Sequence, residues 1–222
     1  MRTLTQLRTG LRDWIQEPNS VAPFTDTFLT RQLNRSLRKL ALKILNKYQE
    51  FYWNTSAIST TDGTYLYAVP TDYWATYGIR NSDNVYLTLA DIQNFADASD
   101  TSAESASATH FGKKGAYMWL WPTPSVTGTA YTHEYFKYPA DMSSESGSPD
   151  FPSGYEDILE LDAAIMCGIT DGATINDARS QYAERLEDMM MTLDEWYKGR
   201  SPQVKFVNRF FGSTYPNTNT TR

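Results

Sequence analysis

Two stretches at the start of the chain carry apolar residues at the three-to-four-residue spacing of amphipathic helices. The first covers residues 3–16, and its apolar positions are Leu4, Leu7, Leu11, Trp14 and Ile15. A linker at residues 17–23 separates it from a longer helix, which Thr25 can cap. The apolar stripe of this second helix consists of Leu33, Leu37, Leu40, Ile44, Tyr48 and Phe51. The pattern therefore predicts a short helix followed by a long one.

The spacing changes to the alternation of β-strands between residues 55 and 139. The alternating positions are Tyr65, Tyr67 and Val69, then Val85, Leu87 and Leu89, then Tyr117, Trp119 and Trp121, followed by an aromatic strand at 131–138. Turn signals separate these strands at Asp62-Gly63, Lys114-Gly115 and Thr127-Gly128. We expect a single helical turn at residues 89–95. The Ser/Ala/Asp/Thr-rich residues 96–109 predict a flexible loop.

Helical spacing returns after a Ser/Gly/Pro-rich linker at residues 141–153. A third helix follows Gly154, and its apolar side consists of Ile158, Leu161, Ala164, Ile165 and Cys167. Gly172 marks a break in the helical pattern, and Asn176 is expected to cap the last helix, which ends near Gly199. This second helical region therefore contributes two further helices.

The order of the elements predicts an α+β fold, in which an α-helical bundle of about four helices carries an antiparallel β insertion. The bundle is formed by residues 1–54 and 140–200, and the insertion, residues 55–139, lies between the second and third helices. Residues 201–222 form an extended C-terminal arm. This arm has no helical period. It is nevertheless too apolar for a terminus that stays in solvent without a partner, because it contains Val204, Phe206, Val207, Phe210 and Phe211. We expect it to become ordered on a partner.

The net charge of −6 is distributed unevenly along the chain. Residues 1–53 carry nine lysines and arginines against four acidic residues, whereas residues 140–200 carry four against fourteen. On the second helix a basic row recurs every four residues at Arg31, Arg35, Lys39, Lys43 and Lys47. Such a row is either a solvated face or a contact with a neighbouring subunit or a phosphate. We predict that Arg31, Arg35, Lys39 and Lys43 form inter-subunit contacts with acidic residues of the last two helices.

Residues able to perform chemistry are few. The chain has one cysteine, Cys167, and two histidines, His110 and His133, without the spacing of a metal site. It also lacks a nucleophile elbow, a Walker loop and a G-x-G-x-x-G motif. We therefore expect no catalytic residue, no metal and no cofactor. The sequence also shows no pattern of a signal peptide or of a membrane span. This favours a soluble cytoplasmic product without membrane contact.

Acidic and aromatic residues leave one enzymatic alternative open. Paired carboxylates, as in glycosidases, occur at Glu156, Asp157, Glu160 and Asp162 and at Glu184, Glu187 and Asp188. Aromatic residues of the strands are able to stack on a sugar, namely Trp119, Trp121, Tyr131, Tyr135 and Phe136. Our main interpretation is that the carboxylates are solvated or salt-bridged and that the aromatic residues pack within the protein.

The order of several short motifs resembles the head-tail adaptor family of lambdoid siphoviruses and podoviruses. The motifs are LRDWI at 11–15, PNS at 18–20, RQLNRSL at 31–37, YLYAVPTDY at 65–73, YMWLWPTP at 117–124, YFKYP at 135–139 and FPSGYEDIL at 151–159. Each motif alone is weak, but together they extend over residues 4–198. The resemblance does not account for the loop at 96–109 or for the aromatic arm.

This resemblance implies a structural virion protein without catalysis, which forms a dodecameric ring between the portal protein and the tail nozzle or tail-tube proteins. Genomic DNA would pass through the ring without sequence-specific binding. Within the arm, Phe206, Arg209, Phe210 and Phe211 are the expected contacts with the portal or a neighbouring subunit. Two alternatives remain: a glycan-binding or glycan-cleaving tail component, and a tail-completion or neck protein without portal contact.

Overall fold

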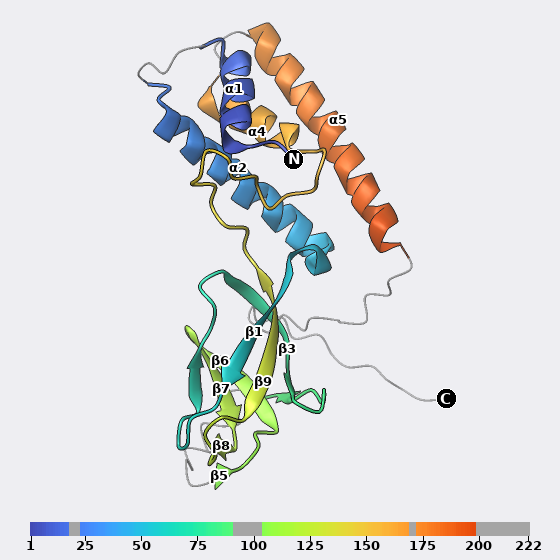
Figure 1. Cartoon of the computed structure of the whole chain (residues 1–222). Helices are drawn as coiled ribbons and strands as arrows, with labels where there is room; N and C mark the ends of the chain where they lie inside the picture. Colours follow the sequence, from blue (N-terminus) through green and yellow to red (C-terminus); the bar gives the residue numbers. More distant parts are fainter. Residues whose placement is uncertain (18–22, 91–103, 169–171, 199–222) are drawn as a thin grey trace, which may run out of the picture.

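Helices and strands occupy opposite ends of the molecule (Figure 1). The computed structural model describes residues 1–17, 23–90, 104–168 and 172–198. Within these residues four α-helices pack together at one end, and nine strands, the longer ones paired antiparallel, form the other end. The predicted α+β fold class is thereby confirmed.

The first two helices begin at caps that the local sequence provides. α1 (Leu4–Ile15) starts with a capping box, in which the Thr3 hydroxyl accepts the Gln6 N–H and the Gln6 side chain accepts the Thr3 N–H at 2.9 Å. α2 (Asp26–Lys47) starts at Thr25, whose hydroxyl accepts the N–H of Phe28 at 3.3 Å. The predicted cap at Thr25 is therefore confirmed.

The last two helices are α4 (Asp157–Cys167) and α5 (Gly172–Tyr197). The prediction that Asn176 caps the last helix is wrong, because α5 begins about one turn earlier, at Gly172. The cost of glycine in a helix applies to the interior, where it loses most backbone freedom, so glycine is tolerated at the first position. Asn176 instead lies inside the helix with an exposed side chain.

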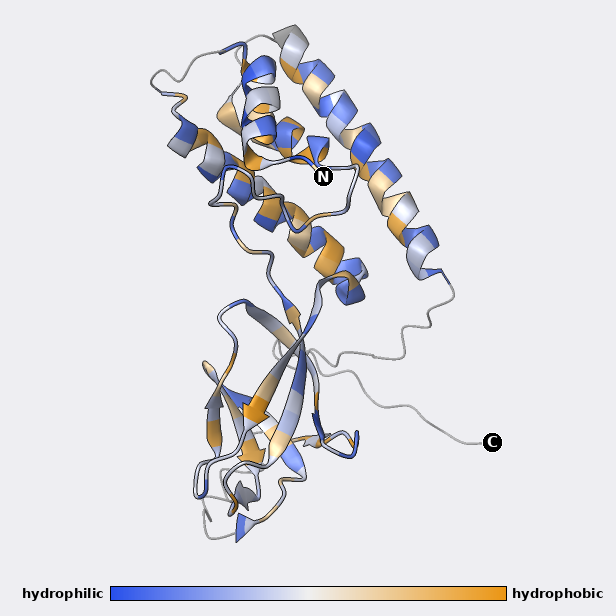
Figure 2. Cartoon of the chain, in the orientation of Figure 1, coloured by the Kyte–Doolittle hydropathy of each residue, from blue (hydrophilic) through white to orange (hydrophobic). Residues whose placement is uncertain are grey.

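α4 lies at the centre of the helical part, where it packs against α1, α2 and α5. All seven residues from Ile158 to Ala164 are buried, so this helix is enclosed on every side. The surrounding helices turn their apolar stripes toward it, and Figure 2 shows apolar and polar positions alternating around α2 and α5. The fully buried residues of the shared core include Leu7, Leu11, Leu33, Leu37, Leu40, Ile44, Ile158, Leu159, Met189 and Leu193. Each contributes about 1.5–3 kcal/mol by its burial.

The β part contains three sheets with the strand orders β1-β9-β3, β2-β7-β6-β4 and β5-β8. All pairings are antiparallel except β4 with β6 and β5 with β8. The strand bounds are β1 Trp53–Ser59, β2 Leu66–Ala68, β3 Tyr73–Asn81, β4 Thr88–Leu89, β5 Glu104–Ser105, β6 His110–Lys114, β7 Tyr117–Trp121, β8 Thr123–Pro124 and β9 Ala130–Lys137. A second core, separate from that of the helices, includes Ile58, Ile79, Met118, Leu120 and Tyr131.

Predicted turns are confirmed where glycine adopts a positive φ. Gly115, between β6 and β7, has a φ of 61°, and Gly128, before β9, has a φ of 91°. The expected flexible loop at 96–109 is only partly described. Its second part is structured, because β5 pairs with β8 and the buried Ala108 N–H donates to the Tyr131 hydroxyl at 2.7 Å. Of the helical turn expected at 89–95, Leu89 lies in β4 and residues 91–95 lie outside the described residues.

Both ends of the β part leave the helical part side by side. A short 3₁₀ helix, η1 (Gln49–Tyr52), leads from α2 into β1, whose first residue Trp53 pairs with Phe136 near the end of β9. Phe136 is 2% exposed and belongs to the helical core. The Tyr52 hydroxyl donates to the Asp150 carbonyl oxygen at 3.0 Å, and Lys137 pairs with the Asp150 carboxylate at 2.6 Å. Both contacts thus join Asp150 to the ends of the β part.

Candidate interaction surfaces

The basic row of α2 divides between two surfaces. Residues four apart on an α-helix advance by about 40° around the axis, so a row of five positions turns through about 160°. Arg31 and Arg35 consequently line an open groove on one side of α2. Lys39, Lys43 and Lys47 lie on the side of α2 that faces α4 and α5.

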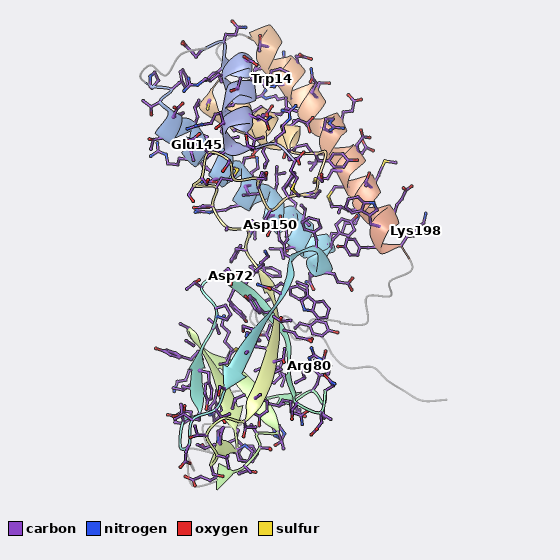
Figure 3. The ribbon with its side chains drawn as sticks, viewed as in Figure 1. Trp14, Asp72, Arg80, Glu145, Asp150 and Lys198 are labelled. Atoms are coloured by element: carbon purple, nitrogen blue, oxygen red, sulfur yellow. The ribbon has the colours of Figure 1, made fainter. Side chains whose placement is uncertain are left out.

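The groove lies between α1, α2 and the segment 141–145 and has a volume of about 700 Å³. Figure 3 shows Glu145 of this segment beside α1 and α2. The side chains that line the groove are mostly polar or charged: Leu4, Arg8, Asp26, Thr27, Thr30, Arg31, Asn34, Arg35, Arg38, Asp141, Ser143 and Glu145. Arg8, Arg38, Asp141 and Glu145 were not singled out from the sequence, since they are far apart along the chain.

Within the groove, some arginines are neutralised and others are not. Arg8 pairs with Glu145, and Arg38 donates to Asp141 at 3.0 Å. The hydrogen bond from Arg12 and the nearby Arg8 hold the pKa of Asp26 below its usual value. Arg31 and Arg35 form no ion pair with any described residue, and the Arg31 guanidinium lies 5.4 Å from the centre of the Phe28 ring. The groove thus presents two exposed, uncompensated positive charges.

The lysine side of α2 is engaged within its own chain. Lys39 pairs with Asp162 of α4 at 2.5 Å, and Lys47 pairs with Asp194 of α5 at 2.7 Å. The Lys43 ammonium lies 3.4 Å from the Tyr182 hydroxyl and 5.7 Å from the centre of its ring. The acidic last helices therefore do pair with α2. The ion pair of Lys39, however, lies within one subunit and not between two subunits. Arg31 and Arg35 are the members of the predicted set that remain on an open surface.

The carboxylates at the start of α4 and within it, which were considered for an enzyme, have structural partners. Glu160 is 3% exposed and accepts a hydrogen bond from Arg2 at 2.5 Å. α1 approaches it closely at Gly10, where a Cβ atom would collide with the Glu160 carboxylate. Burial raises the pKa of Glu160 to about 7 in spite of Arg2. Glu156 accepts the Gly154 N–H at 2.9 Å, and Arg185 donates to Asp157 at 2.8 Å. Glu160 thus ties the start of the chain to α4, and Asp157 ties α4 to α5.

The exposed side of α5 carries a second concentration of charge. Besides Asp194, its exposed acidic residues are Asp177, Glu184, Glu187, Asp188 and Glu195. Two apolar side chains lie exposed on the same helix, Met191 at 59% and Trp196 at 52%. This combination of acidic and large apolar side chains on one helix suits a protein partner with basic and aromatic residues.

Neither histidine forms part of a metal cluster, and no group of three or more potential ligands occurs in the part of the chain that the structure describes. His133 is 1% exposed, lies 3.1 Å from the Thr76 hydroxyl and stacks on Tyr135. Burial lowers the pKa of His133 to about 4, so it is neutral near pH 7. His110 contacts the edge of the Trp121 ring.

Most aromatic residues considered for sugar stacking belong to the interior. Tyr131, Tyr135 and Phe136 are at most 3% exposed, and only Trp119 and Trp121 are half-buried. Burial raises the pKa of the Cys167 thiol to about 11, which keeps it protonated and unreactive as a nucleophile near pH 7. No helix in the described ranges combines the length and apolar character needed to cross a membrane.

Phe206, Arg209, Phe210 and Phe211, the predicted contacts of the arm, lie outside the described residues. The described chain ends at Lys198, which Figure 3 places at the end of α5. Just before it, the Tyr197 ring stacks on Tyr48 at the end of α2, with ring centres 5.8 Å apart. The described chain therefore ends next to the junction between the helical and β parts.

Comparison with protein families shows which family has this sequence. The family model described as SU10 adaptor protein matches residues 2–205, which includes both helical segments and the whole β part. The chain belongs to the SU10 adaptor protein family. The resemblance to phage head-tail adaptors is thereby confirmed, and this SU10 adaptor is a structural adaptor protein of a bacteriophage. Comparison of the adaptor with curated proteins gave no match.

Proposed function

We propose that this SU10 adaptor docks as a ring on the portal protein and connects it to the tail at the head-to-tail junction of the virion. The family match over residues 2–205 carries the proposal, because it extends over the helical bundle and the β part together. The subunit would assemble in the host cytoplasm. The tail nozzle or tail-tube proteins are its partners on the other side of the ring.

The inter-subunit contact in this proposal joins the groove of one subunit to α5 of the next. A closed ring needs two different surfaces that fit each other on every subunit. Arg31 and Arg35 provide a positive surface, and Glu184, Glu187 and Asp188 provide a negative surface on another helix. Opposite charges across such a contact select the correct neighbour and its register.

The C-terminal arm is proposed to bind the portal or an adjacent subunit through Phe206, Arg209, Phe210 and Phe211. Each buried phenylalanine contributes about 1.5–3 kcal/mol, while ordering a residue costs about 1–2 kcal/mol of backbone entropy. A short arm with several aromatic anchors therefore binds only when most of the anchors are buried. Arg209 adds a positive charge that an acidic partner surface can pair with.

Genomic DNA would pass through the ring as part of its exit channel. The subunit has a net charge of −6, and an acidic lumen does not form the phosphate contacts that retain DNA. The twelvefold copy number is taken from the resemblance to head-tail adaptors. DNA would therefore slide through the ring without sequence-specific binding.

Cryo-electron microscopy of the purified chain mixed with its portal protein tests the proposal. A ring of adaptor subunits on the portal, with twelve copies, is the expected result. A variant that lacks residues 201–222 should keep its helix content and nearly the same melting temperature but bind the portal much more weakly. Binding to tail proteins without any binding to the portal would instead identify a tail-completion or neck protein.

A further inference from the structure

One face of the β1-β9-β3 sheet carries a row of three aromatic rings, of which the middle one, Tyr77, is half-buried and packs against the helical core. Trp53 stacks on Tyr77 with ring centres 4.8 Å apart, and Tyr86 meets the edge of Tyr77 at 6.1 Å. Trp53 is 40% exposed and Tyr86 is 50% exposed. Ile58 and Ile79 lie in the β core and belong to the other face of this sheet. We call Trp53, Tyr77 and Tyr86 the aromatic face.

The rings of the aromatic face are held in position. The Tyr86 hydroxyl donates to the Glu134 carboxylate at 2.7 Å, and Arg80 pairs with the other oxygen of that carboxylate at 2.8 Å. Gly78 leaves room for the ring, because a Cβ atom at this position would lie 2.9 Å from Tyr86. Rings fixed before binding lose little side-chain entropy when a partner covers them. The face is therefore suited to anchor an apolar segment.

The end of the described chain lies close to this face. Tyr197 stacks on Tyr48, and only η1 separates Tyr48 from Trp53. A 3₁₀ helix rises about 2 Å per residue, so Tyr48 and Trp53 are on the order of 10 Å apart along it. From Tyr197 an extended chain reaches about 30 Å by Phe206, at roughly 3.3 Å per residue. The C-terminal arm is long enough to cover the aromatic face of its own subunit.

The composition of the arm fits the same surface. Residues 203–211 have the sequence QVKFVNRFF, in which apolar residues predominate and the two charges are the positive Lys205 and Arg209. The phenylalanines provide the rings that complete an aromatic stack.

We propose that in the unassembled subunit residues 203–211 dock on the aromatic face of the same chain. Docking would cover apolar residues of the arm and of the sheet until assembly. The proposal does not rest on the proposed function. If the arm also binds the portal, assembly has to release it first from the aromatic face.

Hydrogen exchange of the full chain, measured by mass spectrometry without portal, tests this docking. The amides of residues 203–211 should exchange about tenfold or more slowly than in an isolated peptide of residues 199–222, because docking requires that several buried side chains together exceed the backbone entropy lost. The variant Trp53→Ala/Tyr86→Ala should lose most of this protection. The matched control Tyr117→Ala/Val126→Ala changes two exposed apolar residues elsewhere on the β part and should retain it.

A second variant, Phe206→Ser/Phe210→Ser, leaves the described residues unchanged and should also lose the protection. Exchange of the arm at the peptide rate in the unaltered chain would overturn the proposal. Protection that survives both aromatic-face substitutions would overturn it as well. Protection that disappears on dilution together with self-association would show that the occupant is a second copy, again contrary to docking within one chain.

Discussion

Glu160 is a buried carboxyl group whose charge state changes near neutral pH. Burial raises its pKa to about 7, from an ordinary value of 4.5. Between these two values the folded chain holds a proton that the unfolded chain has released. The stability that this group contributes is therefore complete below pH 4.5 and is lost as the pH rises through 7. His133 has the opposite effect, because its lowered pKa of about 4 removes stability as the pH falls from 6.5.

The variant Glu160→Gln should isolate this contribution. The glutamine side chain stays neutral at every pH, so the variant lacks this pH dependence. From about pH 5 to about pH 8, the unaltered chain should therefore lose about 1–3 kcal/mol of its free energy of unfolding relative to the variant. Urea denaturation at several pH values measures this difference, in which the contribution of His133 cancels. Glu184→Gln, at an exposed position of α5, serves as the control and should show no such dependence. A pH-independent difference for Glu160→Gln would contradict the assignment.

Asp162 is the second buried carboxylate of α4, and Lys39 is its partner. Asp162 is 2% exposed, so removal of the lysine leaves a buried charge without compensation. Lys39→Met should lower the free energy of unfolding by about 1–3 kcal/mol. This is less than for a fully buried ion pair, because Lys39 itself is half exposed. Lys43→Met, one turn further along α2, should cost much less. Equal losses for the two variants in urea denaturation would show that the ion pair has no special role.

At the scale of elements, α2 provides both a structural and a proposed assembly surface. Reversal of Lys39 would disturb the bundle, so assembly is better tested at Arg31 and Arg35, which form no ion pair with described residues. Arg31→Glu/Arg35→Glu should weaken ring formation, most strongly at low salt, where charges are least screened. Sedimentation of the adaptor with its portal at low and high salt measures this effect. Lys114→Glu, at an exposed position in the β part, is the control, and unchanged assembly of the double variant at every salt concentration would exclude the contact.

At the scale of the whole molecule, the two cores predict that the helical part can fold without most of the β part. Ser56 pairs with His133 across β1 and β9, so a short Gly/Ser linker can replace the residues between them. Such a variant retains Phe136, which belongs to the helical core. It should keep the helical circular dichroism signal and unfold cooperatively, at a lower melting temperature because the β contacts are lost. Loss of the helical signal would show that the two parts are one folding unit.

Local patterns in the sequence were sufficient for the features that depend on neighbouring residues. The stripes of α1 and α2, the cap at Thr25 and the turns at Gly115 and Gly128 follow from periodicity, capping and backbone preference. β3 was not predicted because it lacks alternation. Nearly all of its residues are half-buried, and two register shifts interrupt its pairing with β9. β5 was missed because it is only two residues long and lies in the Ser/Ala-rich residues 96–109, which show no alternation.

The sequence by itself determined the α+β class, the succession of two helices, a β region and two further helices, and the resemblance to head-tail adaptors, since each depends on spacing and order along the chain. Only the tertiary structure decided which charges meet. It assigned Lys39 to Asp162 and Arg2 to Glu160, and left Arg31 and Arg35 on the groove. The physical reason is that charges interact over a few ångströms, whereas these partners are separated by more than a hundred residues. Their contacts therefore depend on how the enclosed helix α4 is packed, which no local pattern specifies.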